Sequence, residues 1–102
     1  MANAIEVISK LGKKVYCAEQ QWFLISNYKH PIMKDKEKEV EETLKDPDEI
    51  RVSKTDSAVY LYHKKYDKEY TSIVVRHLNV DGAILTAYKT TNIKEGKAVY
   101  KK

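Results

Sequence analysis

The chain has 102 residues, of which 42% are hydrophobic and 33% are charged, and its formal net charge is +4. This length and composition predict one globular domain over residues 1–102 and exclude a disordered chain. No run approaches the ~20 apolar residues of a membrane span, and MANAIEVISK lacks the basic and apolar regions of a secretory signal, so we expect a cytoplasmic protein without membrane contact.

The N-terminal part of the chain predicts two short strands and a helix. Brief alternation of apolar and polar residues over 4–9 and 14–18 indicates the strands. The near-helical spacing of Trp22 and Ile25 indicates a short helix over 19–28.

A second helix is expected over residues 32–46. The residue before a proline is pushed out of the helical region, so Pro31 separates the two helices and suits the first turn of the second one. Met33, Val40 and Leu44 form one apolar stripe along this helix, and its many charged residues form a solvated outer face.

The rest of the chain is rich in β-branched and aromatic residues and predicts a sheet. The expected strands cover 49–53, 58–66, 71–78 and 83–90, and 98–100 is a candidate terminal strand. Asp81-Gly82 is a strong hairpin signal. As the central pair of a tight turn, it places Val80 opposite Ala83 and His77 opposite Thr86.

The register of the preceding hairpin decides which side chains share a face, because a slip of one residue turns a strand over. A loop of even length pairs Lys65 with Tyr70 and collects one apolar face that a helix can cover. That face holds Val59, Leu61, Val74, Ala83, Leu85 and Ala87. His63 falls on the same side and is assigned a structural role. The opposite, open face holds Tyr60, Tyr62, Lys64, Ile73, Val75, His77, Ile84, Thr86 and Tyr88. The fold class is therefore predicted as α+β, with two N-terminal helices packed on one face of a twisted antiparallel sheet of about four to five strands.

Charge is divided unevenly along the chain. Residues 1–50 hold 8 Lys/Arg and 10 Asp/Glu, a net charge of −2, whereas residues 51–102 hold 11 and 5, a net charge of +6. Six of the eight tyrosines lie in the basic half. Basic charge interleaved with aromatic rings suits RNA, whose phosphates and bases it can contact. The alternative is a solvated sheet face built from strand-favouring tyrosines.

The open face carries groups that suit a phosphate-bearing substrate. Lys64 can neutralise a phosphate, the hydroxyls of Thr86 and Tyr88 can orient its oxygens, and His30 at the helix junction can project over the sheet edge and move a proton. These four are the candidate catalytic residues, and Tyr60, Tyr62 and His77 are the candidate substrate-binding residues.

No metal or other cofactor is expected. The histidines fit no zinc spacing, and the absence of a carboxylate cluster argues against a magnesium nuclease. The only cysteine, Cys17, is assigned to the core.

The order of short motifs resembles a known family. The motifs are Glu19-Gln20-Gln21-Trp22, His30-Pro31, VEETLKDPDEI (40–50), LYHKKY (61–66), SIVVRHL (72–78) and DGAILTAY (81–88). Together they resemble the small phage and bacterial nuclease-like domains grouped with barnase, EndoU, colicin D and RelE. The resemblance implies an α+β domain that cleaves RNA without a metal, often as a toxin, and whose partners include RNA and a cognate antitoxin or inhibitor protein.

Carried over by position, the resemblance assigns His30 to the His-Pro histidine, Lys64 to a strand arginine and Thr86 and Tyr88 to the hydroxyls of the TAY motif. Tyr62 matches the first strand tyrosine. Three positions depart from the family pattern: lysine replaces the arginine at 64, His63 stands in place of a second tyrosine, and Leu24 replaces a histidine. Two hypotheses follow, a metal-independent endoribonuclease and a non-catalytic RNA-binding or partner-binding module on the same scaffold. An accessory domain without a nucleic-acid role is the third.

Overall fold

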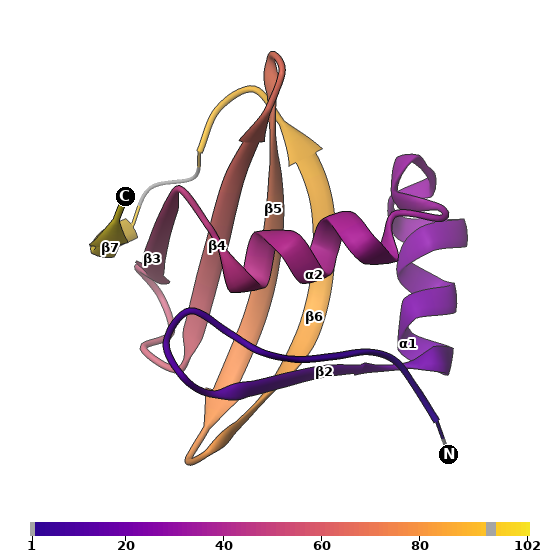
Figure 1. Ribbon diagram of the computed structural model, residues 1–102, viewed down its shortest axis with the longest axis horizontal. Coiled ribbons are helices and arrows are strands. Elements are labelled where there is room, and N and C mark those ends of the chain that lie inside the picture. The colour runs from indigo at the N-terminus through magenta and orange to yellow at the C-terminus, as the bar shows by residue number, and fades with distance from the viewer. Residues whose placement is uncertain (1, 94–95) are drawn as a thin grey trace.

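The computed structural model describes residues 2–93 and 96–102, which form a mixed α+β fold dominated by one sheet (Figure 1). The elements in chain order are β1 (Asn3–Ile8), β2 (Lys14–Ala18), α1 (Glu19–Leu24), the π-helical turn η1 (Ile25–Lys29), the 3₁₀ turn η2 (Pro31–Met33), α2 (Glu37–Lys45), β3 (Glu49–Ser53), β4 (Val59–Tyr66), β5 (Glu69–Leu78), β6 (Asp81–Thr90) and β7 (Gly96–Lys101). The predicted strands are all present.

The sheet has seven strands in the order β1-β2-β6-β5-β4-β3-β7, where four to five were expected. It is also not wholly antiparallel, because β2 pairs in parallel with the start of β6 through Lys14↔Asp81, Val15↔Gly82 and Tyr16↔Ala83. This pairing attaches the N-terminal hairpin to the central strands. The other five neighbouring pairs in the sheet are antiparallel.

The two predicted helices are both interrupted. The first continues from α1 into η1 and stops at His30, whose extended backbone (φ −141°, ψ 78°) is what a residue before proline adopts. The second begins as the η2 turn and restarts at Glu37, because Asp35 takes a left-handed conformation (φ 63°). Within the described residues, no helix is long and apolar enough to cross a membrane.

Helix α2 lies across one face of the sheet, and the N-terminal hairpin runs along the same side (Figure 1). The predicted stripe of Met33, Val40 and Leu44 is fully buried there. The residues of β4, β5 and β6 in this core are Tyr62, Ile73, Val75, Ile84 and Ala87. Four of these five were assigned to the open face, so the prediction of which face the helices cover is wrong. We call the face under α2 the covered face and its opposite the outer face.

The predicted register between β4 and β5 is confirmed, with Lys65 paired to Tyr70. The next hairpin differs, since its two-residue turn is Asn79-Val80 and His77 pairs with Gly82. Asn79 has a positive φ of 48°, which asparagine tolerates better than most residues. The offset from the predicted pairing is four residues, an even number, so it does not by itself change which side chains share a face.

A β-bulge in β6 does change the faces. Val75 pairs with Ile84 but Val74 pairs with Thr86, so Leu85 is an extra residue in this ladder. Beyond the bulge Ala87, opposite Ile73, points to the covered face. Thr86 and Tyr88 are therefore turned to the outer face, away from Tyr62.

Candidate functional site

His30, Thr86 and Tyr88 meet in one pocket on the outer face. Its volume is about 430 Å³, and its lining residues are Lys29, His30, Val74, Leu85, Thr86 and Tyr88. The rings of His30 and Tyr88 are in contact, with centroids 5.6 Å apart and planes inclined by 39°. Three of the four predicted catalytic residues, from segments far apart in the sequence, are thus brought together.

The position of His30 follows from the way the first helix runs beside β6. Only the first residues of β6 pair with β2, so the rest of that edge is left for α1, η1 and η2 (Figure 1). Gln21 of α1 donates a hydrogen bond of 2.8 Å to the carbonyl of Leu85, the bulged residue. The helical segment ends at His30, whose side chain then projects past the sheet edge toward Tyr88, as the sequence predicts.

The surface of the pocket is mainly carbon and aromatic. The hydroxyl oxygens of Thr86 and Tyr88 are buried. Burial raises the pKa of the Tyr88 phenol, and a hydrogen bond with Ser72 opposes this rise. In this conformation the ring of Tyr88 lines the pocket, and its hydroxyl points into the protein. The remaining polar residues among those that line the pocket are His30 and the exposed Lys29.

Behind Tyr88 lies a buried polar row that sequence reasoning missed. Ser72 pairs with Tyr88 on one side and with His63 on the other, and Nδ1 of His63 lies 2.7 Å from the Ser72 hydroxyl. Both residues are fully buried. Burial lowers the pKa of His63 to about 4, an effect that Glu49 opposes and Arg51 reinforces, so the imidazole is neutral near pH 7. If the bulge could be predicted from the sequence, Ser72 and His63 would be expected beside Tyr88.

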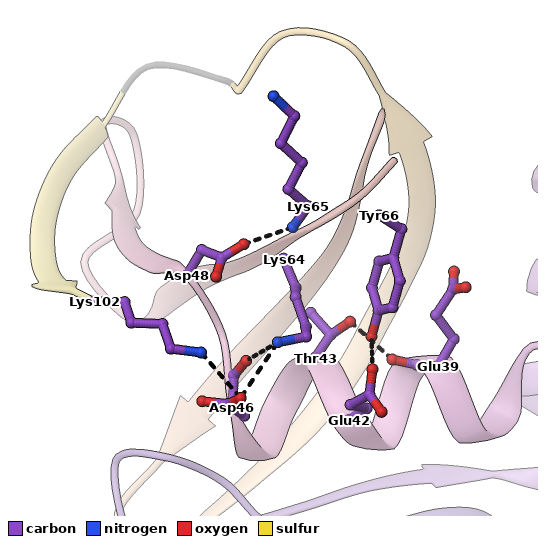
Figure 2. Close-up of polar contacts among 9 residues, drawn as sticks. All are labelled: Glu39, Glu42, Thr43, Asp46, Asp48, Lys64, Lys65, Tyr66 and Lys102. Carbon is purple, nitrogen blue, oxygen red and sulfur yellow. Dashed lines mark hydrogen bonds and ion pairs between the residues drawn. The ribbon is translucent and has the colours of Figure 1, made fainter. Parts of the chain in front are cut away.

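Lys64, the fourth predicted catalytic residue, lies on the covered face. Its ammonium donates to the carbonyl of Asp46 at 2.9 Å and contacts the Asp46 carboxylate at 3.3 Å (Figure 2). Asp46 is the residue that ends α2. Lys64 therefore binds the carboxyl end of a helix, where a cation is favoured, instead of the pocket.

The three predicted substrate-binding residues form a cluster on the covered face. The hydroxyl of Tyr62, fully buried, lies 2.8 Å from Nε2 of His77 and donates to Ser9 at 3.0 Å. Tyr60 packs its ring edge-on against His77, with centroids 5.0 Å apart. Burial raises the pKa of Tyr62 to about 12 and lowers the pKa of His77. These contacts place Tyr60, Tyr62 and His77 in the packing under the N-terminal hairpin.

The expectation that Tyr62 and Thr86 share one open face is thus wrong, because the bulge at Leu85 separates them. Leu85 itself stays on the outer side, where it lines the pocket with Val74. The predicted single cluster is split into a pocket on the outer face and a structural cluster on the covered face.

In the part of the chain that the structure describes, no group of three or more His, Cys, Asp or Glu side chains is arranged to hold a metal ion. A scan against protein-family models, a search of curated proteins and a search of solved structures found no match to this chain.

Proposed function

We propose that this protein is a metal-independent endoribonuclease whose reaction takes place at the pocket on the outer face. The observation that carries the proposal is the meeting of His30 with Tyr88 at a pocket that also contains a lysine. An imidazole beside a cation is what RNA cleavage by the ribose 2′-OH needs.

The proposed chemistry uses the substrate's own hydroxyl. His30 takes the proton of the 2′-OH, whose oxygen attacks the adjacent phosphorus. The bond to the 5′-oxygen breaks, that oxygen takes a proton from water, and the products are a 2′,3′-cyclic phosphate and a 5′-hydroxyl. Lys29 stabilises the negative charge that develops on the phosphate oxygens. This assignment moves the cationic role from Lys64 to Lys29, because Lys64 lies on the covered face.

A second candidate function is RNA binding without cleavage. It is favoured by two observations: the Thr86 and Tyr88 hydroxyls are buried, and His30 is the one histidine among the residues that line the pocket. Under this alternative, the pocket and the basic half of the chain bind RNA. The protein is then not a toxin, and an antitoxin partner has no role.

The experiment that separates the two is the substitution His30→Ala. A positioned general acid–base contributes about 10²–10⁴-fold to a reaction rate, so cleavage of single-stranded RNA should fall by about that factor. The fall should appear in kcat, with RNA affinity and the unfolding temperature nearly unchanged. Cleavage by the native protein should survive EDTA and leave 2′,3′-cyclic phosphate ends.

Tyr28→Ala provides the matched control. Tyr28 is two residues from His30, is 71% exposed and does not line the pocket, so its substitution should leave cleavage unchanged. Equal cleavage by the native protein and His30→Ala, or cleavage that needs a divalent metal, would refute the proposed mechanism. RNA binding without any cleavage by the native protein would establish the second candidate.

A further inference from the structure

We propose that the pocket on the outer face is a base subsite, in which one unstacked nucleobase of single-stranded RNA lies against the ring of Tyr88. The proposal rests on the endoribonuclease function above and deepens it by naming the part of the substrate that the pocket holds. It also replaces the expectation that Thr86 and Tyr88 hold phosphate oxygens.

The lining of the pocket selects a flat apolar surface over a phosphate. Val74 and Leu85 contribute aliphatic carbon, Tyr88 contributes an aromatic ring, and the hydroxyl oxygens of Thr86 and Tyr88 are buried. A phosphate placed against Val74, Leu85 and the ring of Tyr88 would lose its water without gaining donors from them. A base has an apolar face that stacks on an aromatic ring, whatever its sequence identity.

The size and charge of the site agree with a nucleotide. The volume of about 430 Å³ lies within the roughly 300–1,000 Å³ of small-molecule sites. His30 and Lys29 stand together at the same pocket, so a base against Tyr88 has its own phosphate next to an imidazole and an ammonium. One pocket thus accommodates both ends of a nucleotide.

The buried row behind Tyr88 explains how its ring is held. His63 Nδ1 and the Ser72 hydroxyl are 2.7 Å apart, while Nε2 of His63 is buried and makes no hydrogen bond within the described residues. The tautomer with hydrogen on Nδ1 avoids an unpaired buried donor. Nδ1 then donates to Ser72, and the hydrogen of the Ser72 hydroxyl is left for the buried phenol oxygen of Tyr88, the residue that pairs with Ser72 across β5 and β6. His63 and Ser72 are positioning residues, and the stacking surface is set before RNA arrives.

The test compares two single-stranded probes of equal charge: a uridine hexanucleotide and a ribose-phosphate hexamer of the same length without bases. Stacking is worth about 1–3 kcal/mol per base, roughly 5–150-fold in affinity, so the native protein should bind the probe with bases more tightly by about this factor. Equal affinity for the two probes overturns the base subsite.

Variants of Tyr88 and Ser72 assign the effect to the ring. Tyr88→Leu should remove the preference for the probe with bases, and Tyr88→Phe, which keeps the ring, should retain most of it. Ser72→Ala should weaken the preference by loosening the ring. Ser26→Ala, which removes another buried hydroxyl that bonds only within its helix, should not. Unchanged preference in folded Tyr88→Leu overturns the proposal.

Cleavage is measured in parallel on the same probes. Loss of the base preference in Tyr88→Leu, with no cleavage by the native protein, supports the base subsite and refutes the endoribonuclease. Cleavage that depends on His30 but shows no dependence on Tyr88 supports the endoribonuclease and refutes the base subsite.

Discussion

His63 illustrates at the scale of one residue how a buried histidine can be connected to a pocket that it does not line. It is fully buried, hydrogen-bonds Ser72 and packs edge-on against the ring of Tyr70, with centroids 6.5 Å apart. Burial is the largest influence on its protonation and favours the neutral form. Its place in the strand pattern predicts a structural role, and its contacts agree with that role while also connecting it to the pocket through Ser72.

The depressed pKa of His63 predicts how stability responds to pH. The folded pKa of about 4 lies below the ordinary value of 6.5, so the unfolded state binds more protons between these values and stability falls as pH is lowered through this window. From pH 7 to pH 5 the contribution of His63 is about 2 kcal/mol. We expect urea unfolding of the native protein to show at least this loss, because burial lowers the pKa of His77 as well.

The substitution His63→Phe isolates this contribution, since it keeps a buried ring and removes the titrating group. It should be less stable than the native protein at pH 7, yet its stability should fall less between pH 7 and pH 5. An identical slope in both proteins would show that His63 is not the buried neutral group that the structure indicates.

At the scale of the elements, the bulge in β6 separates what the sequence can predict from what it cannot. Alternation and turn signals place the strands, and the even register of β4 and β5 follows from the need for one apolar face. Nothing in the pattern ILTAYKT signals an extra residue at Leu85. Its neighbours are apolar or small, so a regular ladder looks equally acceptable. One inserted residue then moves Thr86 and Tyr88 to the other face and divides the predicted site.

The covered face was assigned wrongly for a related physical reason. Lys64 and Tyr62 look like open-face residues because they are polar, but long and aromatic side chains can bury their stems and satisfy their ends elsewhere. Lys64 reaches Asp46, and Tyr66 donates a 2.5 Å hydrogen bond to Glu42 on the same helix (Figure 2). Such partners depend on where α2 crosses the sheet, and the sequence pattern of a single strand does not show where that is. The position of His30 at a helix end, in contrast, is local, and it was predicted.

The contact between Lys64 and the end of α2 makes a prediction at this scale. Lys64→Met removes a donor from the last turn of the helix, so the unfolding temperature should fall. Specific cleavage activity of the folded fraction should be unchanged, in contrast to the loss of about 10²–10⁴-fold expected for His30→Ala. Thermal unfolding and cleavage at a temperature well below the transition measure the two effects. A large loss of activity at unchanged stability would restore Lys64 to the catalytic role that the resemblance assigned to it.

At the scale of the whole molecule, basic and acidic residues that are far apart in the sequence form ion pairs in the fold. Several cations of the basic half are paired with acids, among them Lys64 with Asp46, Lys89 with Glu39 and Arg76 with Asp56. These pairs reduce the positive field that the net charge of +6 suggests. Under the proposed function, attraction of RNA to the pocket then depends on the lysines that lie near it, and Lys29 is the lysine among the lining residues.

Salt dependence measures which lysines meet phosphates. Each phosphate contact with single-stranded RNA contributes about −0.7 to the slope of log K against log salt. Lys29→Ala should make this slope shallower by about that amount, because the proposed reaction places a phosphate next to the Lys29 ammonium. Lys38→Ala removes an exposed lysine from α2, on the covered side of the sheet, and should leave the slope unchanged although the loss of net charge is identical. Fluorescence titration of a labelled single-stranded hexanucleotide between low and physiological salt gives both slopes.

Equal shifts of the slope for the two variants would mean that RNA binding depends on the overall charge of the protein and not on the outer face. Binding that is independent of salt would exclude phosphate contacts at any surface of the protein.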